Sequence, residues 1–369
     1  MKKFFIISLS LFLLVGSFYL IYNFLLVEDD KESSLGETAN ENSEVKPNTD
    51  KISRIVEGPV MGIALDESLG KLQYYSFKDQ GFWLASFDGA IKKRLSSDNW
   101  PNLKEVIWNN KTKKEVILKI EDSFYLYVFG NKEKFIKKSE ALSWLNFNQL
   151  IVYTYKNFAT NKVTLNAANP DGTAWREIQE LETDNLKMGH IPQSAKSFFY
   201  LKPDANRESN LTIIPIVGNE LEKKGTPKFG SQYLWSNDGG KFLRSSVTKK
   251  GSSSLLLEVC EARSEVCKNL NLPTMATKCV WAKDNKSIYC AAPVNLPENI
   301  LLPNDYIDNK IFTKDTFLKI NTDSGKKEKV IEDKLIKDSL DATELLLSAK
   351  EDFLFFVDRK SGGLFRIII

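Results

Sequence analysis

Four cysteines are the residues of this 369-residue chain whose type and spacing best suit chemistry. Cys260 and Cys267 are seven positions apart, and Cys279 and Cys290 follow with a spacing of eleven. Such thiols can bind a metal, act as nucleophiles or form disulfides. The chain has no C-x-x-C pair, and its only histidine, His190, is far from all four cysteines. We therefore predict no metal site, and disulfide formation is the chemistry to test against the fold.

Catalytic motifs are not found in the sequence. His190 has no G-x-S-x-G motif that could supply a serine nucleophile. The sequence also has no P-loop and no G-x-G-x-x-G motif, so no nucleotide cofactor is indicated. A glycosidase would need carboxylates that converge in the fold, and sequence spacing alone does not show this. We predict no catalytic residue and no cofactor.

A recurring motif indicates the elements that would position the cysteines. An apolar residue or Trp precedes a short polar turn and a β-rich run, as in "LWSNDGGKFLRSSV". A third strand follows, then in most units a turn with Gly, Asn or Asp that suits tight hairpins, and a more polar fourth strand. Four antiparallel strands per repeat of roughly 40–50 residues are typical of a β-propeller. Seven units occur, with anchors at Leu65, Trp108, Trp144, Ile191, Trp235, Trp281 and Leu347.

The seventh unit indicates how the ring would close. It supplies three strands, the last of them "LFRIII" at the end of the sequence. Residues 51–56 are a candidate for its missing fourth strand, and this pairing would remove exposed sheet edges. We predict an all-β, seven-bladed propeller of four-stranded antiparallel blades over residues 51–369, with residues 51–56 closing the last blade.

The turn of the fifth unit resembles that of a known family. Trp235, Ser236, Asp238, Gly239 and Lys241 are similar to the W-S-P-D-G-K turn of TolB-type, WD-repeat-like propellers, although the family's Pro is missing. "VWAKDNKSIY" and "IWNNKTKKEVI" are weaker copies of the same turn. The resemblance implies a propeller over about residues 52–369. It implies little about function, because propellers include enzymes, binding proteins and scaffolds.

The repeat pattern also sets the hairpin register around the cysteines. In "KCVWAKDNKSIYC", a turn centred between D and N places Cys279 opposite Cys290. In "VCEARSEVC", a turn centred between R and S places Cys260 opposite Cys267. Opposed Cα atoms lie about 4.5–5.5 Å apart, which is within disulfide range. We predict both disulfides, in keeping with an oxidising exterior; the alternative is four buried free thiols.

Blade six carries an insertion, residues 293–315, that breaks the repeat. It contains three prolines and several large apolar residues, and a long loop in a compact domain is usually functional or disordered. We expect the insertion to lie over one propeller face and to form part of a binding surface. The alternative is that it packs down as a cap on its own blade. The candidate binding residues are Ile300, Leu301, Leu302, Tyr306 and Ile307.

The N-terminal residues have the composition of a membrane anchor. Residues 4–27 carry no charge, follow Lys2 and Lys3, and are long enough to span a lipid bilayer as one helix. No A-x-A cleavage pattern follows, which favours an uncleaved signal anchor over a cleaved signal peptide. The two lysines favour a cytoplasmic N-terminus and a propeller outside the membrane. Residues 28–50 are polar, and we expect a disordered linker there.

Charge composition limits the partners that we expect. The chain has 51 basic and 48 acidic residues, a net charge of +3, and its lysines are spread along the sequence. Nucleic-acid binding is not indicated, because it would require a clearly basic domain. We predict a non-catalytic, extracytoplasmic binding or scaffold propeller that recognises an envelope protein or a cell-wall component. The alternative is a glycosidase- or peptidase-like propeller enzyme that uses carboxylates in its channel.

Overall fold

The computed structural model describes residues 50–66, 68–109, 112, 114–145, 149–215, 220–297 and 299–369. The chain divides into two compact units, Met1–Val45 and Lys46–Ile369. The predicted membrane span and nearly all of the predicted linker lie outside the described residues. Among the residues that are described, no helix is long and apolar enough to cross a membrane.

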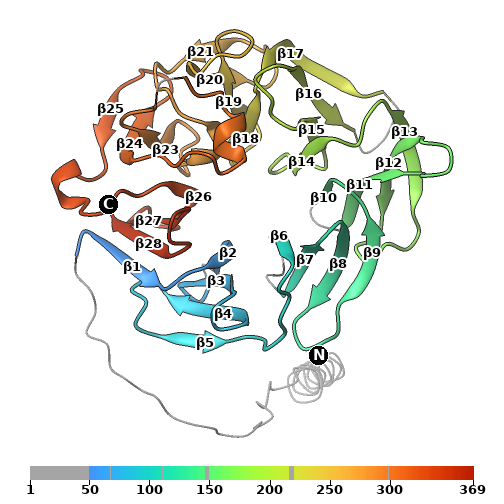
Figure 1. Cartoon of the computed structure of the whole chain (residues 1–369), viewed down its shortest axis with the longest axis horizontal. Coiled ribbons are helices and arrows are strands. Elements are labelled where there is room, and N and C mark those ends of the chain that lie inside the picture. The colour runs from blue at the N-terminus through green and yellow to red at the C-terminus, as the bar shows by residue number, and fades with distance from the viewer. Residues whose placement is uncertain are drawn as a thin grey trace, which may run out of the picture. The chain divides into compact units, whose positions relative to one another are not determined.

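Seven four-stranded antiparallel sheets make up the second unit and surround a central opening (Figure 1). This arrangement confirms the predicted seven-bladed β-propeller. In blades one to six, the strands follow in chain order from the inner to the outer edge (Figure 1). Blade one consists of β2 (Val60–Asp66), β3 (Lys71–Ser76), β4 (Gly81–Ser86) and β5 (Lys92–Arg94); blade two of β6 (Leu103–Trp108), β7 (Glu115–Ile120), β8 (Ser123–Val128) and β9 (Lys134–Lys138); blade three of β10 (Leu142–Leu145), β11 (Leu150–Lys156), β12 (Val163–Ala168) and β13 (Arg176–Leu181). Blade four consists of β14 (Leu186–His190), β15 (Ser197–Leu201), β16 (Glu208–Ile214) and β17 (Glu222–Phe229); blade five of β18 (Gln232–Trp235), β19 (Lys241–Val247), β20 (Leu255–Glu261) and β21 (Cys267–Asn269); blade six of β22 (Cys279–Trp281), β23 (Ser287–Pro293), β24 (Asp315–Asn321) and β25 (Lys327–Lys329).

Blade seven joins the two ends of the propeller sequence. It contains β26 (Ala342–Leu347), β27 (Phe353–Asp358), β28 (Leu364–Ile368) and, as its outer strand, β1 (Ile52–Val56). β1 pairs antiparallel with β28, from Ile52 opposite Ile367 to Val56 opposite Leu364. This pairing matches the closure expected from the missing fourth strand of the seventh unit.

Tryptophans of the repeat connect adjacent blades. Trp108 donates its indole Nε1–H to the carbonyl of Gly62 in blade one at 2.7 Å. Trp281 makes the corresponding bond to the carbonyl of Leu234 in blade five at 3.2 Å. Both side chains are buried, and a buried indole requires a partner for its single N–H group. The anchor positions therefore combine packing between blades with a fixed hydrogen bond.

The polar turn of blade five shows why the repeat needs its small and acidic residues. Ser236 donates its hydroxyl to Asp238 Oδ1 at 2.6 Å, and the same oxygen accepts the Gly240 amide at 2.9 Å. Gly239 has a φ of +68°, and a Cβ there would lie 2.7 Å from the Pro192 carbonyl oxygen. A side chain at position 239 would thus strain the backbone and collide with blade four.

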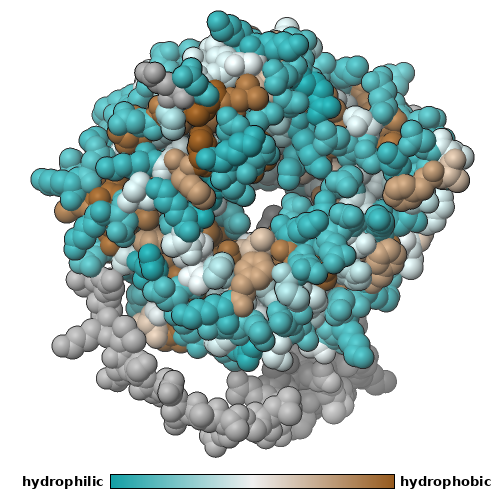
Figure 2. Space-filling model, viewed as in Figure 1, coloured by the Kyte–Doolittle hydropathy of each residue, from teal (hydrophilic) through white to brown (hydrophobic). Residues whose placement is uncertain are grey.

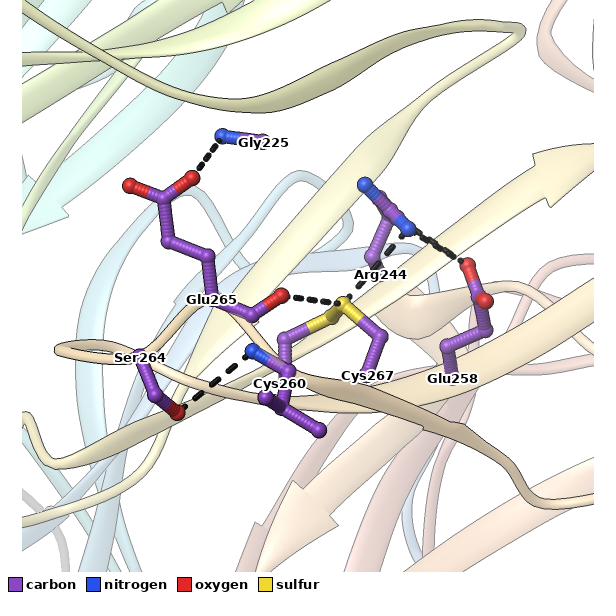
Figure 3. Close-up of a disulfide and its surroundings, with 8 residues drawn as sticks. Gly225, Arg244, Glu258, Cys260, Ser264, Glu265 and Cys267 are labelled. Carbon is purple, nitrogen blue, oxygen red and sulfur yellow. Dashed lines mark hydrogen bonds and ion pairs between the residues drawn. A yellow bond between two sulfur atoms is a disulfide. The ribbon is translucent and has the colours of Figure 1, made fainter.

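Both predicted disulfides are confirmed. Cys260 and Cys267 are cross-strand partners and form one disulfide, and Cys279 and Cys290 are partners and form the other. The first joins β20 to β21 and the second joins β22 to β23 (the first is shown in Figure 3). Arg244 lies beside the first disulfide, with its Nη2 3.5 Å from the Cys267 sulfur.

The blade-six insertion is folded and extends beyond its own blade. It contains the short helix α2 (Asn304–Ile307), and Leu302 packs in a buried cluster with Ala205 of blade four and Val247 of blade five. Asn304 Oδ1 accepts the amide of Ala205 at 2.8 Å. The insertion therefore covers the blade-four and blade-five loops on its face of the propeller. Two further short helices are the 3-10 helices η2 (Ala276–Lys278) and η3 (Asp333–Leu335).

Candidate functional site

The residues predicted to form a binding loop occupy different environments. Leu302 is fully buried and Tyr306 is 7 % exposed, so both pack down onto the propeller. Ile300 and Leu301 are half-buried against the same cluster. Ile307 is 46 % exposed. A partner can contact Ile307 directly, whereas Leu302 and Tyr306 hold the insertion in place.

A buried charge network explains how the insertion is fixed. Lys278 Nζ lies 2.8 Å from Asp315 Oδ2 and 2.7 Å from Asp341 Oδ1, and all three side chains are at most 1 % exposed. Tyr306 donates its hydroxyl to Asp341 at 2.9 Å, and the Arg359 guanidinium stacks on the Tyr306 ring with its Cζ 3.7 Å from the ring centroid. Burial alone would lower the pKa of Lys278, but its anionic neighbours raise it. We interpret this network as structural, since its groups are mutually paired and shielded from solvent.

A second group of charges lies where the inner strands of blades two to four begin. We name Glu105, Lys119, Glu140, Lys187 and Lys202 the mouth cluster. Glu105 on β6 is directly opposite Lys119 on β7. Lys119 donates to the Glu140 backbone carbonyl at 2.7 Å, and Lys202 forms an ion pair with the Glu140 carboxylate at 3.1 Å. These inner strands border the opening at the centre of the ring, which Figure 2 shows to be accessible and bordered largely by hydrophilic residues.

The mouth cluster contains more ammonium groups than carboxylates. Burial lowers the pKa of Lys119; the charges of Glu140 and Glu105 oppose this effect, and the charges of Lys202 and Lys187 add a smaller lowering. Lys187 is exposed and has no ion pair among the described residues.

A hollow of 280 Å³ adjoins the mouth cluster. Glu140 belongs to both, and Lys138, Lys156 and Phe158 also line the hollow. The Phe158 ring is 73 % exposed, with Lys138 Nζ 5.5 Å from its centroid. The site therefore offers an apolar ring surface beside charged groups, a combination that suits recognition of an amphipathic ligand.

Glu344 of blade seven carries a further carboxylate on an inner strand. Its backbone has a φ of +51° at an irregularity in the β26–β27 pairing, and its side chain accepts the Ile63 amide at 3.1 Å. Glu344 is exposed to solvent, but protein surrounds its carboxylate. This surrounding protein raises the pKa of Glu344, and the charge of Glu105 raises it by a smaller amount. Glu105 of blade two is thus close enough to affect the ionisation of Glu344.

His190 does not form a nucleophile–base pair with the serine that lies opposite it in the sheet. It is the last residue of β14, and burial lowers the pKa of its imidazole. Its cross-strand partner Ser197 donates its hydroxyl to the Trp144 carbonyl at 3.0 Å instead. Within the described part of the chain, no group of three or more His, Cys, Asp or Glu residues is arranged to hold a metal ion.

Sequence reasoning did not find the mouth cluster. Its five members lie in five different stretches of the chain, and only the ring brings blades two, three and four together. A usable pattern was nevertheless present, because Glu105 and Lys119 interrupt the apolar runs "LKEVIW" and "EVILKI". Charges at inward positions of strands indicate either a pair or a site.

Fold and site together define a seven-bladed β-propeller with a charged mouth at its central channel. No known protein family and no curated protein matches the chain by sequence. Among solved structures, oligogalacturonate lyase from Vibrio parahaemolyticus is similar, with a TM-score of 0.62 and 11 % identity over 86 % of this chain and 93 % of the lyase. A streptogramin B lyase has a TM-score of 0.55 and 11 % identity over 85 % and 96 % of the two chains.

TolB from Acinetobacter baumannii is also among the similar structures. Its TM-score is 0.42, with 10 % identity over 86 % of this chain and 78 % of TolB. At 11 % identity, the similarities to the two lyases establish the fold alone. Propellers that catalyse and propellers that bind share this architecture, so function must be argued from the site.

Proposed function

We propose that this protein is a non-catalytic binding propeller whose channel mouth recognises an acidic cell-wall glycan. The lysine excess of the mouth cluster carries the proposal, because Lys187 is exposed and lacks a carboxylate partner among the described residues. Phe158 in the adjoining hollow offers its ring to the less polar face of a sugar. An acidic segment of an envelope protein is the competing ligand for the same charges.

The proposed setting is the outer face of a membrane. Residues 4–27 would anchor the chain, and residues 28–50 would tether the propeller within reach of the cell wall. The composition of these segments supports this proposal. Protease added to intact cells should then remove the propeller, and full protection from the protease would contradict the orientation.

Binding can be tested with polymers of known charge. We expect the full chain in nonionic detergent to co-sediment with polygalacturonate and not with neutral dextran. A Lys119→Gln/Lys187→Gln variant should bind at least about tenfold more weakly, since one charge-assisted hydrogen bond contributes about 1.5–3 kcal/mol and 1.4 kcal/mol is tenfold in affinity. Lys92→Gln/Lys93→Gln on the outer strand β5 is the matched control.

Three outcomes would overturn the glycan proposal. Equal retention on both polymers would exclude charge recognition, and equal loss in the control variant would exclude the mouth as the site. Cross-linking on intact cells that captures one envelope protein through the mouth cluster, without binding to cell-wall material, would replace the glycan by a protein ligand.

A propeller enzyme is the second candidate, and the shifted pKa values favour it. The pKa of Lys119 is lowered and that of Glu344 is raised, mainly through burial in both cases, so each group is brought nearer to the range of a general acid or base. Release of unsaturated or shortened products from polygalacturonate, lost in Glu344→Gln, would establish this function. Binding without any turnover would favour the non-catalytic protein.

A further inference from the structure

A second candidate site is distinct from the mouth cluster, because none of the five residues of that cluster lines it. A groove of 710 Å³ lies between blades three and four; residues of β13, β15, β16 and β17 line it, and it reaches Leu186 on the inner strand β14. Leu181, Leu201 and Leu221 are half-buried in its lining, and Phe199 is 9 % exposed. These side chains form an apolar floor that is open to solvent.

The border of this groove is acidic. Glu182, Glu208 and Glu220 line it, are exposed, and form no ion pair among the described residues. Glu180 also lines the groove, but Lys162 pairs with it at 3.4 Å. Lys223 is the one lysine in the described lining. The groove thus suits an occupant that has an apolar side chain between basic ones.

Another rim strand of the same chain has this chemistry. β9, with the sequence "KFIKK", is the outer strand of blade two and pairs only with β8 among the described strands, so its outer edge is free. Phe135 is 55 % exposed, and Lys134 and Lys138 beside it are exposed as well. Lysines on an edge strand usually prevent association. Phe135 adds an exposed aromatic ring to this edge, with its centroid 5.5 Å from that of the Tyr125 ring on β8.

We propose that β9 of a second copy docks into the acidic groove. Phe135 would rest on the leucine floor, and Lys134 and Lys138 would face Glu208 and Glu220. Lys134 already pairs with Asp171 at 3.1 Å, but its side chain is 67 % exposed. Such a surface pair contributes little to stability and can be exchanged for a partner in another copy.

This contact would be heterologous and would repeat. The groove and β9 belong to different blades of a rigid ring, so one copy cannot fill its own groove. A docked pair leaves one groove free on one copy and one β9 free on the other. Further copies can therefore join head to tail. Lys138 also lines the hollow beside the mouth cluster, whereas Glu208 and Glu220 belong neither to that hollow nor to the cluster. The groove variant described below therefore tests the contact independently of the proposed function.

Site-specific photocross-linking on the full chain tests the contact directly. Phe135 is replaced by a photoreactive phenylalanine analogue, and two differently tagged copies are produced together in membranes. We expect a cross-linked dimer that carries both tags, with the cross-link mapping to the leucines of the groove. Cross-links that map elsewhere on the chain, or only to other proteins, would overturn the proposal.

Charge reversal gives an independent test with a built-in rescue. A strand variant, Lys134→Glu/Lys138→Glu, and a groove variant, Glu208→Lys/Glu220→Lys, should each lose at least tenfold of the cross-linked dimer. Mixing the two variants should restore it, because each groove then meets a strand of opposite charge.

A matched control and two outcomes complete this test. Lys92→Glu/Lys93→Glu on β5 makes the same change of charge on another rim strand and should leave the dimer unaffected. Unchanged dimer in both reversed variants, or failure of the mixture to recover while each variant remains folded by circular dichroism, would refute the assignment.

Discussion

Removing the Lys278 ammonium should destabilise the whole face that the insertion covers. In Lys278→Met the carboxylates of Asp315 and Asp341 remain together in a fully buried site, without the cation that lies 2.8 and 2.7 Å from them. Removal of one partner from a buried ion pair typically costs about 3–5 kcal/mol. At about 2 °C per kcal/mol for a large domain, the Tm should fall by about 6–10 °C.

The assay is thermal unfolding of the full chain in detergent, followed by near-ultraviolet circular dichroism. Lys310→Met is the matched control, because Lys310 also pairs with two aspartates but has a side chain that is 62 % exposed. Exposed pairs contribute about 0–1 kcal/mol, so this variant should lose no more than about 2 °C.

Limited proteolysis adds a local measurement to the same experiment. Lys278→Met should be cleaved within residues 294–314 faster than the parent, since Lys278 bonds Tyr306 and Thr313 of the insertion at 3.2 and 2.9 Å. Equal Tm losses in Lys278→Met and Lys310→Met, with no new cleavage, would refute the view that this network holds the insertion.

Three further predictions concern stability. Replacing Cys279 and Cys290 by serine should cost about 2–3 kcal/mol, because the disulfide closes a short loop; denaturant titration measures the loss, and mass mapping of the parent without reductant should find no free thiol. Deleting residues 364–369 removes β28 and with it the partner of β1, so the product should be insoluble or non-cooperative in a thermal scan, and a parent-like Tm would contradict the closure. Hydrogen bonding from Ser236 lowers the pKa of Asp238, so its stabilisation is present above the unfolded pKa of about 4 and disappears as pH falls through the lower folded value. Asp238→Asn should therefore cost about 1 kcal/mol at pH 7, and the gap to the parent should close in urea titrations near pH 3.

The sequence was informative wherever a local pattern repeats. Strand runs, hairpin turns and the opposed cysteines depend on contacts within one hairpin, so register could be read from the position of the turn. The closure of the last blade by residues 51–56 could be predicted because the seventh unit supplies only three strands of its own. These features specify the fold because each blade makes the same local choices.

Contacts between different blades could not be predicted from patterns within one hairpin. The Lys278 network combines residues from η2, the insertion, β24 and the loop before β26, and nothing in their spacing indicates a common site. The mouth cluster was missed for the same reason. The insertion was identified as exceptional, but its burial against Ala205 depends on a loop 99 positions before Asn304 in the sequence.

The seventh blade also determines how the propeller would respond to force. Any pull on the chain ahead of Ile52 is transmitted first to β1, and β1 is held in its sheet by its pairing with β28. The closure of the ring is therefore the first structure to bear the load, while blades one to six are reached only after it opens. Mechanical tension would separate the ring at one defined seam and leave the remaining blades as a connected row.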